Sequence, residues 1–247
     1  MLKYLETHFH PLESIETGTK VGIGVATGAD DVFLTTDSNL VESSRLLPLA
    51  MAYDIKHGQL CWSGHYLVNP WGPEGPVDLA YFPRLRAYFA CPESQLRGRH
   101  VGRRSGDRWY RTIDRVNHGL TAEPKLYVPD IKGRIEPVFD RRQTYPHHNL
   151  YVVQSAVWDH EVLGGLLLSA IGQFFVECYG VRMRGGYLRF QAQYLRRIRV
   201  PRPEAIDAVQ ARDLRDAFRR RDRRQATDVA LRLYGLTELP LEEAVRT

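Results

Sequence analysis

Residues 20–34 read KVGIGVATGADDVFL and decide between two kinds of fold. A dinucleotide-binding fold places a G-x-G-x-x-G loop between a strand and a helix, with the phosphates at the helix N-terminus. Here the third glycine comes one residue too late, and the β-branched and aromatic run DDVFLTT favours a strand. We therefore predict a hairpin, with strands at 21–25 and 32–35, and no nucleotide site.

The hydrophobic pattern of the rest of the chain predicts short strands and, mainly in its last third, helices. Strands are predicted at 65–68, 125–128, 150–153 and 198–203, and helices at 85–90, 155–179, 204–221 and 226–234. The helix at 155–179 has a wide apolar face and is expected in the core. Because strands and helices do not alternate, the sequence predicts an α+β fold with mixed or antiparallel sheets, a central buried helix and C-terminal helices. We expect an α+β domain at 1–203, on which the helical segment 204–247 packs.

The composition is that of a globular protein. The chain has 247 residues, of which 43% are hydrophobic, and a formal net charge of +5. No apolar stretch reaches the ~20 residues of a membrane helix, and the N-terminus lacks the apolar core of a signal peptide. We therefore expect a cytoplasmic protein without a membrane partner. The three cysteines form no C-x-x-C pair, which favours reduced thiols buried in the core.

The positive charge is concentrated in one stretch. Residues 97–115, RGRHVGRRSGDRWYRTIDR, contain seven arginines and two aspartates. Arginines beside aromatic side chains are typical of a surface that binds a polyanion. A solvated loop whose arginines pair with acids elsewhere is the alternative. On the first interpretation, the candidate phosphate contacts are Arg99, Arg103, Arg104 and Arg108.

A second basic segment follows the central helix, where residues 182–193 read RMRGGYLRFQAQ. Its glycines allow close backbone approach, its arginines can donate to phosphate or guanine, and its tyrosine can stack on a base. An ordinary loop with surface arginines is the alternative. Together with the Lys-Gly-Arg run at 132–134, the candidates for contacts near the DNA grooves are Lys132, Arg134, Arg182, Arg184, Tyr187 and Arg189.

The sequence contains no recognisable catalytic motif. The histidines of HFH at 8–10 and the pair at 147–148 lack further ligands at a known metal-site spacing. Residues 123–130, EPKLYVPD, hold the letters of a PD…ExK nuclease in reverse order. There is no P-loop and no G-x-S-x-G. We predict no catalytic, cofactor-binding or metal-binding residues in this chain.

Several segments together resemble the C-terminal target-recognition domain of TaqI-type and Eco57I-type adenine-N6 DNA methyltransferases. Residues 20–34 look like the family's G-I-x-T-G-A-x-x-V-F segment, WSGHYLVNP at 62–70 like its Y-L-I-x-P segment, and DRWYRTI at 107–113 like its W-Y signature. The run at 182–203 and the ending ALRLYGLTE at 230–238 are similar to later blocks. The blocks follow the family's order and cover nearly the whole chain.

This resemblance implies a module that reads the sequence of double-stranded DNA. In the family, a separate catalytic domain binds S-adenosylmethionine and holds a flipped adenine at an Asn-Pro-Pro-Tyr motif. The nearest letters here, Asn69-Pro70-Trp71-Gly72, lack the second proline and the tyrosine. We therefore expect no cofactor and no methyl transfer in this chain alone. Its expected partner is a methyltransferase catalytic domain or subunit, where S-adenosylmethionine would bind.

Two other functions stay open. A specificity or interaction subunit would use the arginine-rich helices at 212–224 to bind a partner methyltransferase chain, although their alternating charges favour a solvated, salt-bridged face. A shortened DNA-modifying enzyme or nuclease would need a carboxylate cluster or a metal, and the sequence indicates neither.

Overall fold

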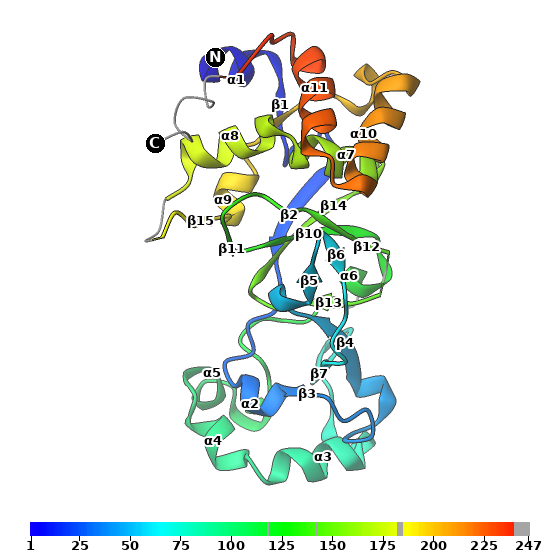
Figure 1. Ribbon diagram of the computed structural model, residues 1–247. Helices are drawn as coiled ribbons and strands as arrows, with labels where there is room; N and C mark the ends of the chain where they lie inside the picture. Colours follow the sequence, from blue (N-terminus) through cyan, green and yellow to red (C-terminus); the bar gives the residue numbers. More distant parts are fainter. Residues whose placement is uncertain (118, 142, 182–184, 240–247) are drawn as a thin grey trace.

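The computed structural model describes residues 1–117, 119–141, 143–181 and 185–239 (Figure 1). Its α-helices are α1 (Leu2–His8), α2 (Asp30–Phe33), α3 (Pro83–Ala90), α4 (Glu93–Gly98), α5 (His100–Arg103), α6 (Gly119–Ala122), α7 (His160–Leu168), α8 (Ala170–Tyr179), α9 (Ala192–Leu195), α10 (Ala208–Arg220) and α11 (Arg223–Tyr234). Its strands are β1 (His10–Pro11), β2 (Thr19–Ile23), β3 (Leu34–Thr35), β4 (Leu46–Ala50), β5 (Ile55–Lys56), β6 (Gln59–Leu60), β7 (Tyr66–Val68), β8 (Trp71–Gly72), β9 (Gly75–Pro76), β10 (Lys125–Pro129), β11 (Ile131–Lys132), β12 (Val138–Asp140), β13 (Tyr145–Pro146), β14 (Leu150–Ser155), β15 (Leu188–Arg189) and β16 (Arg199–Val200).

A four-stranded antiparallel sheet with the strand order β12-β10-β14-β2 lies in the middle of the molecule (Figure 1). Both faces of this sheet are covered. On β14, Tyr151 and Val153 belong to one hydrophobic cluster, whereas Leu150 and Val152 belong to a second cluster on the opposite face. Strands buried on both faces read as continuous apolar runs, as residues 126–129 of β10 and 150–153 of β14 do. The two strands predicted here are confirmed.

The first cluster packs helices α7, α8, α10 and α11 on the sheet (Figure 1). The helix predicted at 155–179 is buried as expected, but it is two helices, bent by 64° where α7 meets α8. Each helix has its own N-cap, because Asp159 accepts from the first turn of α7 and Ser169 from the first turn of α8. Among the described residues, no single helix is long and apolar enough to cross a membrane, and only α7 and α8 together meet that test.

The two charged helices predicted near the C-terminus are confirmed as α10 and α11. Helix α10 packs on α7 and is tied to it by ion pairs, from Arg215 to Asp159 at 2.7 Å and from Arg219 to Glu161 at 2.5 Å. The apolar faces of α10 and α11 join the first cluster. That 1–203 forms a domain of its own stays a prediction.

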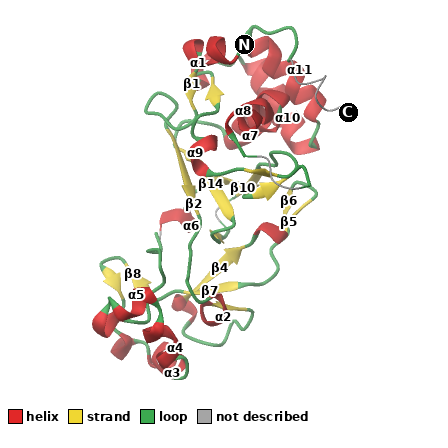
Figure 2. Ribbon diagram, turned by 90° about the vertical axis from the view of Figure 1, so that its left-hand side faces the viewer, coloured by secondary structure: helices red, strands yellow, loops and turns green. Residues whose placement is uncertain are grey.

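The second cluster fills the other end of the molecule, where a mixed sheet of order β13-β4-β7-β3 meets α2 and α3 (Figures 1 and 2). Strand β7 and helix α3 confirm the predictions at 65–68 and 85–90. The hairpin predicted for 21–35 is wrong, because β2 pairs with β14, β3 pairs with β7, and α2 lies between them. Two aspartates begin α2, where the helix dipole favours negative charge. The α+β class with mixed and antiparallel sheets is confirmed.

The cysteines differ from expectation. Cys61, Cys91 and Cys178 are free, and all three are exposed rather than buried. None of them belongs to either hydrophobic cluster. Cys91 directly follows α3, and Cys178 lies in the last turn of α8.

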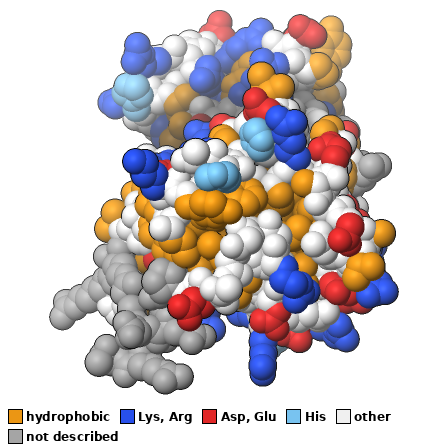
Figure 3. All heavy atoms as spheres, turned by 90° about the horizontal axis from the view of Figure 1, so that it is seen from above, with side chains coloured by type: hydrophobic (Ala, Val, Ile, Leu, Met, Phe, Trp, Pro, Cys, Tyr) orange, Lys and Arg blue, Asp and Glu red, His pale blue; other side chains and the backbone are white. Residues whose placement is uncertain are grey.

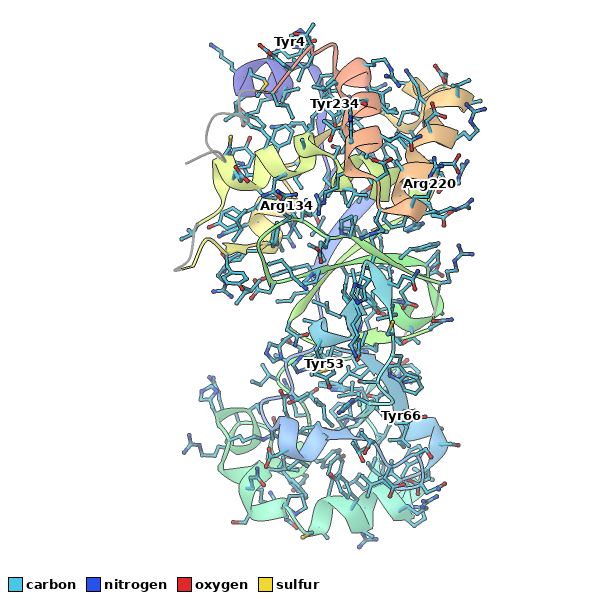
Figure 4. All side chains as sticks on the ribbon, in the orientation of Figure 1. Tyr4, Tyr53, Tyr66, Arg134, Arg220 and Tyr234 are labelled. Carbon is cyan, nitrogen blue, oxygen red and sulfur yellow. The ribbon has the colours of Figure 1, made fainter. Side chains whose placement is uncertain are left out.

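The end of the molecule at which α1 and α11 lie has a partly hydrophobic surface. Seen from above, hydrophobic side chains gather there beside basic and histidine side chains (Figure 3). Tyr4 of α1 lies at this end (Figure 4), is 40% exposed, and has its ring centroid 4.3 Å from that of His8. This surface is on the far side of the central sheet from the mixed sheet.

Candidate nucleic-acid interface

Arg99, in the basic stretch 97–115, turns inward. Its guanidinium donates to the backbone carbonyls of Thr27, Trp109 and Arg111 at 3.0, 3.2 and 2.8 Å. Burial lowers the pKa of Arg99, although an arginine remains charged. Arg99 therefore holds the basic loop against the segment that precedes α2, and its predicted phosphate contact stays a prediction.

The other arginines predicted in this stretch are exposed. Arg103 and Arg104 end α5, and neither forms an ion pair with a described residue. Arg108 donates to a backbone carbonyl of β9 at 2.8 Å and otherwise faces solvent. Arg97 fits the alternative interpretation, in which arginines of this stretch pair with acidic residues of the protein, because it forms an ion pair with Glu93 at 2.7 Å. The stretch therefore leaves unpaired positive charge at the surface around α5.

Strands β11 and β15 form a two-stranded antiparallel ribbon that contains Lys132 and Arg189 of the second predicted group, with Arg134 after β11 and Tyr187 directly before β15. Tyr187 is 51% exposed, and Arg134 is exposed without an ion pair to a described residue. Lys132 lies 3.7 Å from an exposed glutamate, a contact too loose to neutralise it. Arg189 instead pairs with Asp130 at 2.8 Å, which fixes it along the ribbon. Arg182 and Arg184 lie outside the described residues.

An open groove of about 890 Å³ is lined in part by residues of β2 and α6. These two elements lie near the middle of the molecule (Figure 2). The lining of the groove includes Lys20, Ile23, Arg115, Asn117 and Gln154. Cationic and amide side chains of this kind are suited to phosphate oxygens and base edges.

Sequence reasoning did not single out the residues of this groove. Lys20 and Gln154 stand opposite each other because β2 pairs with β14, a pairing that the predicted hairpin excluded. Arg115 belongs to the basic stretch, and its positive charge was the only signal that could have found it. The groove was thus missed because long-range strand pairing forms it.

The exposed arginines of α5 and the ribbon β11–β15 lie toward the same side of the molecule. In Figure 1, α5 and the strands β11 and β15 are drawn on the left, below and above the narrow middle of the molecule. Figure 4 shows Arg134 nearer this side and Arg220 of α10 on the other. The chain therefore brings two basic groups, 97–108 and 132–134, to one side.

The sequence contains two histidine pairs that were considered as metal ligands, and neither was predicted to bind a metal. In the HFH segment, His8 donates to the carbonyl of Tyr4 at 2.8 Å, and His10 accepts from Arg202 at 3.1 Å, so the two rings serve separate contacts. The pair His147 and His148 meets an aspartate, Asp30, that lies far away in the sequence. No sequence spacing could have indicated this third residue.

Comparison with known proteins finds relatives over the full length of the chain. No family model matches it. It is 46% identical over 239 residues to the type II methyltransferase M.PaeR7I of Pseudomonas aeruginosa, 44% identical over 240 residues to M.XhoI of Xanthomonas vasicola, and 36% identical over 244 residues to M.BstVI of Geobacillus stearothermophilus. These alignments cover 96–98% of this chain but only 41–44% of each relative.

Two solved structures share its fold. The type IIL restriction-modification enzyme MmeI, in complex with DNA, matches 95% of this chain with a TM-score of 0.63 and 13% identity, over 35% of the MmeI chain. The type IIG restriction endonuclease BpuSI matches 87% with a TM-score of 0.55 and 14% identity, over 26% of its own chain. The homologues of this chain are therefore type II methyltransferases of restriction-modification systems, of which it spans less than half the length, and its fold also occurs in other restriction-modification enzymes.

Proposed function

We propose that this chain is the part of a type II adenine-N6 DNA methyltransferase that recognises the target sequence in double-stranded DNA. The observation that carries the proposal is the placement of exposed arginines that form no ion pair with a described residue toward one side of the molecule, Arg103 and Arg104 at α5 and Arg134 after β11, with a polar groove near the middle. A DNA duplex is a polyanion long enough to contact both groups, and its affinity for a protein comes mainly from phosphate contacts.

The lengths of the relatives support a division of labour. The chain aligns with less than half of each type II methyltransferase. Methyl transfer, with S-adenosylmethionine as the donor and adenine as the acceptor, is proposed to reside in a catalytic domain or subunit outside the chain. The TaqI-like character of the recognition part belongs to the same proposal.

The two basic groups are proposed to have different tasks. Arg103, Arg104 and Arg108 lie on the surface of a loop that Arg99 fixes, so they suit contacts with phosphates, which set orientation without reading sequence. Tyr187 and Arg134 are exposed next to the ribbon, and a stacking face and a guanidinium suit base edges.

The alternatives receive less support. Arginines Arg215 and Arg219 of α10 already pair with carboxylates of α7, so these charges are used within the chain rather than kept for a partner. A nuclease centre at the EPKLYVPD run is disfavoured because Lys125 is fully buried and pairs with Asp140 at 2.8 Å.

A binding selection tests the proposal. The full chain is incubated with a randomised duplex pool at low and at moderate salt, the retained DNA is sequenced, and affinity is followed by fluorescence anisotropy. We expect enrichment of a short motif that contains adenine and a steep loss of affinity with salt. The same selection with Arg134→Ala should relax the motif, whereas the matched Arg220→Ala on the other side should not change it. Unselective binding, both alone and with a methyltransferase partner added, would overturn the proposal.

A further inference from the structure

Asp30, His147 and His148 come together at a junction of the fold. Oδ2 of Asp30 lies 3.1 Å from Nε2 of His147, and the rings of His147 and His148 have centroids 3.9 Å apart. One possible ligand atom from each of the three side chains lies within 4.8 Å of the others. The cluster joins the first turn of α2 to the segment after β13, which are 117 residues apart in the chain.

The backbone fixes this arrangement before any ligand is present. The N–H of His147 donates to the carbonyl of Ala50 at 2.9 Å, and the N–H of His148 donates to the carbonyl of Val25 at 3.0 Å. The carbonyl of His147 accepts from Leu150, which closes the turn. The backbone of both histidines is therefore held by β4 on one side and by the segment at Val25 on the other, and this placement does not depend on a metal.

The side chains also differ in burial in a way that suits a half-open site. His147 is 3% exposed, while Asp30 and His148 are exposed. The second carboxylate oxygen of Asp30 accepts from the hydroxyl of Thr27, so the orientation of the carboxylate is fixed as well. Ligands oriented by hydrogen bonds to neighbouring groups are a common feature of metal sites.

We propose that Asp30, His147 and His148 bind one divalent zinc-class ion at this junction. Two imidazole nitrogens and a carboxylate oxygen are typical zinc ligands, and bonds of 2.0–2.1 Å in a tetrahedron place neighbouring ligand atoms about 3.3 Å apart. The separation of 3.1 Å between Oδ2 of Asp30 and Nε2 of His147 is close to this distance between neighbouring ligand atoms. The fourth position faces solvent and takes water.

The ion would cross-link α2 to the segment after β13. It links two segments that enclose a loop of more than a hundred residues, and cross-links that close long loops remove the most entropy from the unfolded chain. The closed loop contains the mixed sheet and the basic stretch 97–115, so the ion would hold that end of the molecule to the central sheet. The proposal does not depend on DNA recognition.

Metal binding can be measured directly on the full chain. The protein is stripped with a chelator, dialysed against buffer with ZnCl₂, and its zinc content is determined by mass spectrometry, while thermal unfolding is followed with and without Zn²⁺. We expect one zinc per chain and a higher Tm with the metal. A zinc content well below one per chain without a shift in Tm would overturn the proposal.

Three variants locate the ion. Asp30→Asn and His148→Ala change exposed residues, so both should fold, and each should weaken Zn²⁺ binding by at least tenfold in a competition with a chromophoric chelator. His8→Ala is the matched control, because it removes an exposed histidine of the HFH segment, and it should bind Zn²⁺ as the unchanged chain does. Equal affinity in His148→Ala and the unchanged chain, or loss of zinc only in His8→Ala, would contradict this site.

Discussion

Gly24 lies directly against the backbone of His147. A Cβ atom at Gly24 would stand 2.2 Å from the carbonyl oxygen of His147, a distance at which the backbone itself must move. The contact is fixed by the hydrogen bonds on both sides of it, from Gly24 to Leu150 and from Val25 to Pro146, each 2.9 Å long. This glycine is needed for close packing of two segments rather than for a phosphate.

We therefore expect Gly24→Ala to lower the free energy of unfolding by about 2 kcal/mol, the middle of the range for overpacking. Gly22→Ala is the control, because an added Cβ at Gly22 has open space within 4 Å. Urea denaturation followed by circular dichroism compares the two. Equal free energies of unfolding for the two variants would contradict the close packing of Gly24 against the backbone of His147.

The fold was predictable where a strand or helix is defined by its own residues, and less so where distant contacts define it. In the runs at 125–128 and 150–153 every residue except Lys125 is apolar, and both runs were found as strands. Residues 32–35 were predicted as a strand, but Val32 and Phe33 belong to helix α2, which follows a segment that Arg99 and the backbone of His148 hold in place. The break between α7 and α8 depends on Ser169, whose capping role is hidden within an apolar run.

The candidate site was predictable as charge but not as geometry. The density of arginine in 97–115 indicated a basic surface, yet it could not separate Arg99, which serves the fold, from Arg103, which faces solvent. Asp30 and His147 are 117 residues apart, and the pairing of β13 with β4 and the backbone hydrogen bonds of Val25 with Pro146 and His148 bring them together. Roles of this kind are set by tertiary contacts.

Arg99→Ala should act mainly on stability. The change leaves the carbonyls of Thr27, Trp109 and Arg111 without their donor, and hydrogen bonds from a charged group contribute about 1.5–3 kcal/mol each in favourable cases. We expect a loss of about 2 kcal/mol in urea denaturation, against less than about 0.5 kcal/mol for the exposed Arg103→Ala. If Arg99→Ala unfolds at the same urea concentration as the unchanged chain, these bonds do not hold the loop.

The exposed arginines of α5 should control the salt dependence of DNA binding. Each phosphate contact contributes about 0.9 to the slope of log K against log salt. The double change Arg103→Ala with Arg104→Ala should therefore reduce the slope by about 2 while leaving stability unchanged. Fluorescence anisotropy over a series of salt concentrations measures this, with Arg220→Ala, which removes one exposed positive charge on the other side of the molecule, as the control. An unchanged slope would show that Arg103 and Arg104 do not contact the phosphates.

Asp140 should be essential for stability because it is the centre of a buried polar group. Its carboxylate accepts from Lys125 at 2.8 Å and from the hydroxyls of Tyr127 and Thr144 at 3.1 Å, and both Lys125 and Asp140 are fully buried. Asp140→Asn leaves the ammonium without a counter-charge, at a cost of about 3–5 kcal/mol. In the Asp140→Asn background, Lys125→Met should recover part of this loss. Additive losses in the double-mutant cycle would show that the two charges do not interact.

His160 should make the stability depend on pH. This imidazole is 7% exposed and stacks on Phe139 with ring centroids 5.4 Å apart, and burial, aided by the charge of Lys125, lowers its pKa below the usual 6.5 although Asp159 opposes the shift. As pH falls through 6.5, the unfolded chain takes up a proton here that the folded chain does not, so the free energy of unfolding falls with it. His160→Phe retains the stack and cannot take up the proton. We therefore expect its stability to fall less between pH 7 and pH 5 than that of the unchanged chain, as measured by urea denaturation at each pH, and parallel pH profiles would contradict the assignment.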